Sequence, residues 1–268
     1  MQTTPNKQEV AVVIGGANGI GAAVCRLMAR MGWRVVVADR DATAAEVLAQ
    51  EIGGVARSVD VTDAGQINAL ASGVEIELGG ADALVVSSGA FQQVLPPEQI
   101  TEEVWNHIVN VNLSGTFRCN TAFGVQMAKR GGGSIVNIAS VTGMQASPVL
   151  AYASTKAAVI NLTQSLACEW GHAGVRVNAV SPGVTLVPRI LKRWSEGGGT
   201  RAAGDPGQHA ALGPGRDAGH RPAEPAHPGE LPDRRRALRL VLLGHWRRPH
   251  PRLDRPRNLR RRDPGRHP

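Results

Sequence analysis

The sequence predicts a doubly wound α/β fold with a mostly parallel sheet. Short apolar runs rich in valine and isoleucine alternate with longer segments of helical pattern, the order that successive β-α-β units produce. The runs are almost continuously apolar, as expected for strands buried on both faces. Most of them end in glycine, aspartate or serine. Right-handed crossovers bring such strand ends to one edge of the sheet, where open α/β sheets bind ligands.

The first unit is a strand, a glycine-rich turn and a helix. Residues 9–14 (EVAVVI) predict a buried strand, and residues 15–21 (GGANGIG) follow it directly. The helical pattern that comes next predicts an apolar face made by Ile20, Val24, Leu27, Met28 and Met31. Glycines allow the backbone to approach a pyrophosphate group, which binds at the N-terminus of a helix. This order of elements indicates a Rossmann-type dinucleotide site.

The second predicted strand, residues 34–38 (RVVVA), ends at Asp39, 18 residues beyond Gly21. An acid near this distance accepts hydrogen bonds from the ribose hydroxyls and repels a 2′-phosphate, so it favours NAD over NADP. Arg40 acts in the opposite sense, because its guanidinium can bind a 2′-phosphate. We therefore expect NAD, with NADP as the alternative. The other interpretation of Asp39 is a turn acid at a strand end.

The remaining elements continue the alternation to residue 180. Helices are predicted at residues 42–52, 64–78, 101–130 and 151–172, and strands at 55–59, 83–86, 134–139 and 175–180. The chain leaves these four strands through Asp60, residues 87–89, Ser140 and Ser181. Together with the glycine turn and the acid after the second strand, these positions are expected to converge on one edge of the sheet.

Ser140 is followed by a tyrosine and a lysine spaced four residues apart, Tyr152 and Lys156. Positions i and i+4 share one face of a helix, so the two side chains should point the same way. A neighbouring ammonium favours the phenolate and lowers the pKa of a tyrosine from its ordinary value of about 10. With the Ser140 hydroxyl as a donor to a substrate oxygen, the three groups can move a proton at a carbonyl or alcohol. The alternative for the pair alone is an exposed helix face.

These residues together resemble the classical short-chain dehydrogenase/reductase family, over residues 8–193. The shared features, in family order, are the glycine turn, Asp39, Asp60–Val61, Asn112, Ser140, the pattern Tyr152-x-x-x-Lys156 and Pro182–Gly183. The resemblance implies an NAD(P)-dependent oxidoreductase that transfers a hydride between nicotinamide and a secondary alcohol or its ketone. It also implies a homo-oligomer, either a dimer or a tetramer.

The resemblance assigns roles to four catalytic candidates. Tyr152 is expected to be the proton donor or acceptor. Lys156 is expected to hold the nicotinamide ribose and to lower the pKa of Tyr152. Ser140 is expected to hydrogen-bond the substrate oxygen. Asn112 is expected to hold a water of the proton relay through an irregularity in its helix.

Cofactor contacts are implied in the same way. The residues expected to cradle the pyrophosphate and ribose groups are Gly15, Asn18, Gly19, Ile20 and Gly21. Those expected near the adenosine are Asp39, Arg40, Asp60, Val61, Ser88 and Gly89. Those expected on the nicotinamide side are Pro182, Gly183 and Thr185, besides Tyr152 and Lys156. No metal is expected.

Three positions depart from the family pattern. Ile14 stands where the family has a threonine before the first glycine. Residues 86–89 (VSSG) stand where it has Asn-Asn-Ala-Gly, so two amides are lost and Ser87 and Ser88 replace them in part. Val187 stands where a threonine usually follows Pro-Gly, with Thr185 nearby. These changes are expected to weaken cofactor binding without removing a reacting group.

The last part of the chain differs in composition from the rest. The net charge of +8 lies entirely in residues 196–268, which hold 16 arginines and 8 acids, while residues 1–195 hold 14 charges of each sign. Residues 196–268 also hold 11 of the 17 prolines, which break helices and central strands. We expect a Rossmann-type domain at residues 1–195 and an Arg/Pro/Gly-rich tail at 196–268 that is disordered or poorly packed.

The family would need a substrate-covering segment, another helix and a closing strand in residues 196–268, and none is readable there. We therefore expect a sheet that is incomplete at its C-terminal edge, with an unpaired sixth strand. One hypothesis is that the tail is an out-of-frame translation of a GC-rich gene, which would leave an impaired nucleotide-binding remnant. The rival, an arginine-rich arm for nucleic acid or a membrane surface, is less favoured because prolines and acids interrupt the arginines.

The sequence disfavours a membrane-spanning protein, a secreted protein and a metal or redox centre. No apolar run is long enough to span a membrane, and we expect no signal peptide. Three widely spaced cysteines without a C-x-x-C pair argue against a metal or redox centre and favour a cytoplasmic protein. We expect a small-molecule alcohol or ketone substrate of unreadable identity. Its pocket should have a mixed polar and apolar wall that includes Phe91, Gln92, Thr142, Met144, Gln145 and Val149.

Overall fold

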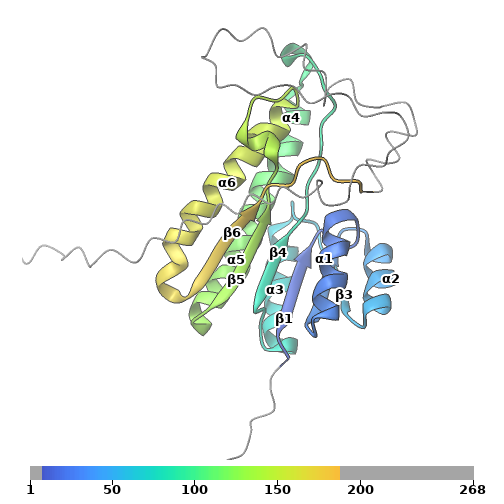
Figure 1. Cartoon of the computed structure of the whole chain (residues 1–268), viewed down its shortest axis with the longest axis vertical. Helices are drawn as coiled ribbons and strands as arrows, with labels where there is room; N and C mark the ends of the chain where they lie inside the picture. The colour runs from blue at the N-terminus through green and yellow to red at the C-terminus, as the bar shows by residue number, and fades with distance from the viewer. Residues whose placement is uncertain (1–7, 188–268) are drawn as a thin grey trace, which may run out of the picture.

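The computed structural model describes residues 8–187, and within them six strands form one sheet. The strands are β1 (Val10–Ile14), β2 (Arg34–Asp39), β3 (Val55–Ser58), β4 (Ala83–Val86), β5 (Gly133–Ile138) and β6 (Val175–Val180). Their spatial order is β3-β2-β1-β4-β5-β6, and every neighbouring pair is parallel (Figure 1). The predicted doubly wound α/β fold is confirmed.

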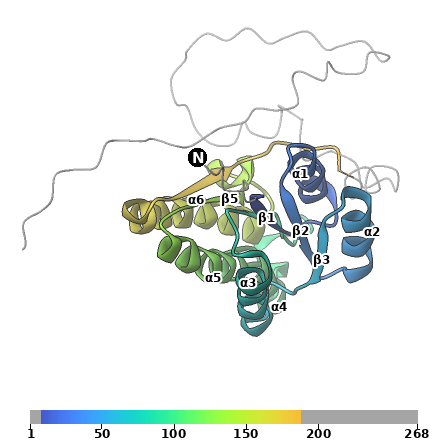
Figure 2. The same ribbon diagram turned by 90° about the horizontal axis from the view of Figure 1, so that it is seen from below.

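Helices cover the sheet from both sides, but unequally. One face carries α1 (Gly19–Arg30) and α2 (Ala42–Ile52), which pack over β1 and β2. The other face carries α3 (Ala64–Leu78), α5 (Gly115–Arg130) and α6 (Leu150–Trp170), and α4 (Glu102–Val109) packs against α6. Figure 2 looks along the molecule and shows α1 and α2 on one side, with α3, α5 and α6 on the other.

Two apolar clusters fill the spaces between these layers. Successive residues of a strand point to opposite faces, so Val12 packs in the cluster under α3 and α5, whereas Val13 packs in the cluster under α1 and α2. All five residues of β1 are buried. In β5 and β6 the pattern alternates instead: Ile135 and Val177 are buried, but Val136 and Val180 are only half-buried.

The helices start and stop at local signals. Asp41 and Asp63 precede α2 and α3, and each accepts a hydrogen bond from a first-turn backbone N–H. Gly53 and Gly79 end the same two helices in the left-handed conformation, which glycine adopts without steric cost. These signals explain why the predicted bounds of α2 and α3 agree with the structure.

The predicted apolar face of α1 is partly wrong. Leu27 and Met31 are 50% and 67% exposed, and the residues that α1 buries are Gly21, Ala22 and Cys25. The glycine turn holds α1 so close to the sheet that a methyl group on Gly16 would lie 3.2 Å from the Cys25 sulfur. Only small side chains fit such a gap. Burial raises the pKa of the Cys25 thiol to about 12, so it stays neutral.

Several expectations lie outside the described residues. They are the end of the domain at residue 195, and the tail 196–268 with its out-of-frame origin and its nucleic-acid role. Within residues 8–187, β6 has one neighbouring strand, β5. No helix of this part of the chain is long and apolar enough to cross a membrane.

Candidate active site

The carboxyl ends of the parallel strands bring the predicted site residues to one edge of the sheet. Gly15 follows β1, Asp39 ends β2, Gly89 follows β4 and Ser140 follows β5. A methyl group on Gly15 would lie 2.5 Å from the backbone nitrogen of Ser88. The turns after β1 and β4 are therefore in contact, as the predicted convergence requires.

The glycine turn is too tight for side chains. Gly15 has a φ of 73°, and Gly15 and Gly16 both donate backbone hydrogen bonds to the Ala38 carbonyl, at 2.8 and 3.1 Å. A methyl group on Gly21 would lie 2.0 Å from the Gly15 carbonyl oxygen. The glycines are thus required for the approach of α1 to β1, because no side chain fits at Gly15, Gly16 or Gly21.

The first turn of α1 has backbone donors to offer. Asn18 precedes the helix but makes no side-chain capping bond, so N–H groups of the first turn lack an acceptor from this cap. Ile20 lies in this turn and is half-buried. Val187 lies opposite, 3.4 Å from the position of a methyl group on Gly19. The arrangement fits a pyrophosphate between α1 and the segment after β6.

Asp39 is held in place by the glycine turn. Its two carboxylate oxygens accept hydrogen bonds from the backbone nitrogens of Ala17, at 3.0 Å, and Asp41, at 3.1 Å. Each oxygen keeps a further lone pair for a ribose hydroxyl. Arg40 is exposed. The residues of this corner fit the adenosine ribose of a dinucleotide.

Asp60 and Val61 follow β3. One Asp60 oxygen accepts bonds from the Thr62 nitrogen (2.8 Å) and hydroxyl (2.7 Å), and these bonds hold the pKa of Asp60 below its ordinary value. Val61 is buried, and its carbonyl accepts a bond from Arg118 at 3.2 Å. Both side chains are therefore fixed by their own surroundings before any ligand binds.

Ser140 lies directly after β5 with an extended backbone. Its oxygen accepts hydrogen bonds from the Thr142 nitrogen, at 3.2 Å, and the Thr142 hydroxyl, at 2.9 Å. The pairing of β5 with β6 continues past both strands, since Val141 donates to the Pro182 carbonyl at 3.1 Å. Pro182 is thereby placed beside Ser140. Further along, the Thr185 hydroxyl donates to the Gly183 carbonyl at 3.2 Å.

Tyr152 and Lys156 lie together on α6, as the four-residue spacing predicts. The Lys156 nitrogen is 5.7 Å from the centre of the Tyr152 ring. It also donates a 2.7 Å hydrogen bond to the carbonyl of Ile138, the last residue of β5. Lys156 is only 4% exposed. The Phe91 ring packs against the Tyr152 ring, and the two ring centres are 4.8 Å apart.

The expected helix irregularity is present. Residues Asn110–Ser114 form one π-helical turn between α4 and α5, a distortion that is frequent at functional sites. The buried Asn112 side chain accepts from the Ala90 nitrogen at 2.7 Å and donates to the Ala90 carbonyl at 2.9 Å and to the Thr155 hydroxyl at 3.2 Å. A methyl group on Gly89 would lie 3.6 Å from the Asn112 side-chain oxygen and 3.7 Å from the Lys156 nitrogen.

Structure adds residues that the motifs did not assign. Thr142 orients Ser140, and Thr155 joins Asn112 to α6 while donating to the Tyr152 carbonyl at 2.7 Å. Gln92 accepts a bond from the Tyr152 backbone nitrogen at 2.9 Å. The closeness of Thr142 to Ser140 in sequence was a usable signal. No sequence signal marked Gln92 apart from its expected place in the pocket wall, because its hydrogen-bond partner Tyr152 lies 60 residues away.

Two serines that follow strands β4 and β6 have buried hydroxyl groups. The Ser88 hydroxyl is buried and has no hydrogen-bond partner within residues 8–187, and the same is true of Ser181 after β6. An unpaired buried hydroxyl is costly unless a ligand or water satisfies it. Both hydroxyls follow strands at the edge where a dinucleotide would lie, so they fit polar atoms of such a ligand.

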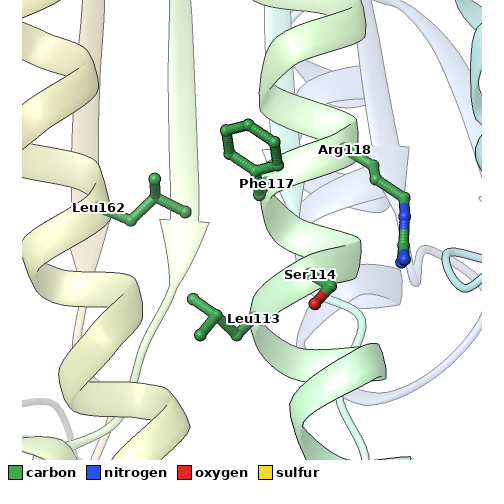
Figure 3. A pocket seen from close by; sticks show the side chains of 5 residues that line it. All are labelled: Leu113, Ser114, Phe117, Arg118 and Leu162. Carbon is green, nitrogen blue, oxygen red and sulfur yellow. The ribbon is translucent and has the colours of Figure 1, made fainter.

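A separate hollow lies away from this edge. It is lined by Leu113, Ser114, Phe117, Arg118 and Leu162, from the π-helical turn, α5 and α6 (Figure 3). None of the predicted site residues lines it. The hollow is therefore not the candidate active site.

Comparison with known proteins agrees with this geometry. The family model described as short chain dehydrogenase matches residues 9–197. D-threitol dehydrogenase of Mycolicibacterium smegmatis is 40% identical over 69% of this chain and 74% of its own length. Galactitol 2-dehydrogenase of Rhizobium johnstonii is also 40% identical, over 68% and 74%.

Among solved structures, one described as ribose-5-phosphate isomerase from Brucella melitensis 16M superposes with a TM-score of 0.71. It shares 43% identity over 73% of this chain and 76% of that chain. The matched region contains the glycine turn, Asn112, Ser140, Tyr152 and Lys156. The chain is thus an NAD(P)-dependent oxidoreductase that acts on an alcohol or its ketone, and it belongs to the short-chain dehydrogenase family.

Proposed function

We propose that this protein oxidises a secondary hydroxyl of a polyol to a ketone, with NAD as the hydride acceptor and Tyr152 as the base. The observation that carries the proposal is the meeting of α6 with the end of β5. There Lys156 reaches the Ile138 carbonyl and lies beside Tyr152, while Ser140 leaves the same strand. These are the groups that a reversible proton transfer at an alcohol requires.

When bound, the nicotinamide would accept the hydride from the alcohol carbon. Tyr152 takes the proton of the reacting hydroxyl in oxidation and returns it in reduction. The positive charge of Lys156 favours the phenolate that this step needs. The Ser140 oxygen accepts both bonds from Thr142, so its own hydroxyl hydrogen can be donated to the substrate oxygen and stabilise charge there.

Asn112 supports the route by which the proton leaves. Its side chain ties the π-helical turn to Ala90 and Thr155, and its backbone carbonyl accepts a bond from Thr116 at 2.7 Å. The irregular turn is the feature by which Asn112 would hold a water between itself and Lys156. This water would connect Tyr152, through Lys156, to solvent.

Asp39 supports the choice of NAD. The backbone bonds from Ala17 and Asp41 fix its carboxylate beside the glycine turn. A fixed negative charge there accepts from two ribose hydroxyls and repels a 2′-phosphate. Arg40 is exposed and follows directly, and it is the group that would bind NADP if the carboxylate were removed.

A polyol substrate is supported by the names of the relatives and by the site wall. D-threitol and galactitol, which name the two dehydrogenases above, are chains of adjacent hydroxyl groups. On this chain, polar Gln92 and Thr142 lie next to apolar Phe91 around Tyr152 and Ser140. A wall of this kind suits a carbon chain that carries several oxygens.

The test is an assay of the full chain with D-threitol and galactitol, each with NAD and with NADP, followed by the absorbance of the reduced nicotinamide. We expect turnover with NAD and little with NADP. Preference for NADP would contradict the assignment of Asp39. A thermal shift with NAD but no turnover on any secondary alcohol would favour the nucleotide-binding remnant instead.

We also propose the limits and assembly of the domain. The family match ends at residue 197, close to the composition change at residue 196, which supports a domain of residues 1–195. Phe117 on α5 is 50% exposed beside the hollow of Figure 3, which supports a dimer through α5 and α6. Light scattering that gives a monomer would contradict this assembly. A cytoplasmic location remains a prediction.

A further inference from the structure

The helix that carries Tyr152 and Lys156 lacks a cap of its own. Val149 precedes α6 and makes no side-chain capping bond, and the first turn holds no acidic residue. First-turn N–H groups of any helix need an acceptor from elsewhere. For Tyr152 that acceptor is the side-chain oxygen of Gln92, at 2.9 Å, from a loop 60 residues earlier in the chain. Gln92 therefore serves as a capping residue of α6.

This bond fixes the orientation of the Gln92 amide. The Tyr152 backbone nitrogen is a donor, so the atom that faces it must be the amide oxygen and not the amide nitrogen. The nitrogen is then directed away from that bond. It is buried and has no hydrogen-bond partner among residues 8–187, although Gln92 as a whole is only 3% exposed. A buried donor without an acceptor destabilises the folded chain until a ligand or water supplies one.

Gln92 and the residue before it both contact Tyr152, the proposed base. Phe91, the preceding residue, packs its ring against that of Tyr152, while Gln92 bonds the Tyr152 backbone. The same short segment thus touches the catalytic residue at its side chain and at its main chain. An acceptor supplied by a substrate bound at Tyr152 would remove the cost of the unpaired donor.

We infer that Gln92 determines specificity by donating a hydrogen bond from its amide nitrogen to a substrate oxygen next to the reacting one. The ligand class is a compound with two adjacent oxygens, such as a vicinal diol, a hydroxyketone or a diketone. The inference rests on the proposed function, since it needs a substrate at Tyr152. The other amide atom keeps its positioning role at the start of α6.

Two variants separate the two roles. Gln92→Glu retains an oxygen to accept from Tyr152 and removes the donor, whereas Gln92→Met removes both. Gln93→Glu is the matched control, because it makes the same change at the exposed neighbour. The substrates are diacetyl and butanone, reduced with NADH. The second oxygen of diacetyl is a carbonyl that can only accept, so a glutamate carboxylate cannot bond it.

Gln92→Glu should lower kcat/KM for diacetyl about tenfold more than for butanone, mainly through KM. Gln92→Met should lose the same discrimination and also lower kcat for both ketones, because Tyr152 is no longer positioned. Gln93→Glu should behave as wild type. Melting temperature and NADH titration by fluorescence check that each variant is folded and binds cofactor.

An equal loss on both ketones in Gln92→Glu overturns the inference and leaves the proposed function standing. Unchanged discrimination in Gln92→Met overturns it as well. If the wild-type chain binds NADH but reduces neither ketone and oxidises no polyol, the proposed function fails, and the inference fails with it.

Discussion

The two halves of the sheet are built differently. Around β1 and β2, helices α1 and α2 cover one face and α3 helps to cover the other, and every residue of β1 is buried (Figure 2). Around β5 and β6, the helices of residues 8–187 cover one face only, and alternate residues such as Val136 and Val180 remain half-buried. The first half holds the candidate nucleotide turn, and the second half holds the candidate reacting groups.

The second half compensates with polar contacts. Asn137 of β5 exchanges hydrogen bonds with Asn120 of α5, at 2.8 and 3.1 Å, and donates to Thr163 of α6 at 3.0 Å. All three side chains are buried. A buried network whose members are satisfied fixes the relative position of the elements that it joins. Directional hydrogen bonds therefore help to position α6, whereas the first half relies on apolar packing.

The largest expected effect separates the two halves by function. Tyr152→Phe should reduce turnover by about 10²- to 10⁴-fold, because the proton donor and acceptor is lost while the ring against Phe91 is retained. NAD binding, measured by thermal shift, should change little, because the glycine turn and Asp39 lie in the other half. Turnover close to that of the wild type would refute the role of Tyr152.

A smaller effect is expected from the nucleotide half. Asp39→Ser should raise KM for NAD about tenfold and raise activity with NADP, because the fixed carboxylate is removed while Arg40 remains. Steady-state kinetics with both cofactors measure the change in preference. Glu46→Ser, which removes an acid from the exposed side of α2, serves as the control and should leave the preference unaltered.

The smallest expected effect tests whether helices bury the two halves of the sheet to different extents. Val13 and Val136 both pack toward the cluster under α1 and α2, but Val13 is fully buried and Val136 is half-buried. Val13→Ala should cost about 2 kcal/mol of unfolding free energy and Val136→Ala about 1 kcal/mol or less. Urea titrations of the two variants measure both losses of unfolding free energy. Equal losses would show that the second half is as well covered as the first.

Much of this arrangement could be predicted from local sequence. The apolar runs located every strand, although only β1, β2 and β4 are almost continuously buried. Parallel topology then placed Gly15, Asp39 and Ser140 at one edge. The face of α1 was misjudged because helical periodicity does not report how closely a helix approaches the sheet. Asn112 is unfavourable in a helix by propensity alone, so its irregular turn was expected only through family resemblance.

Contacts between distant segments could not be predicted from the local sequence. The bond between Gln92 and Tyr152 joins a loop to the first turn of α6, and no spacing rule connects the two. The exchange between Asn120 and Asn137 likewise depends on how a helix packs on a strand. Both contacts are polar and buried, and neither leaves a periodic signal in the chain.

The π-helical turn at Asn110–Ser114 has a consequence for the evolution of chain length. Such a turn is an α-helical turn with one surplus residue. Deleting that residue would restore a regular α-helix and would move the neighbouring side chains around the helix axis. The deletion would remove no hydrophobic residue from the core if it fell on Asn110 or Ser114, yet it would swing Asn112 away from Ala90 and Thr155. This stretch therefore tolerates substitution far better than it tolerates a change in length.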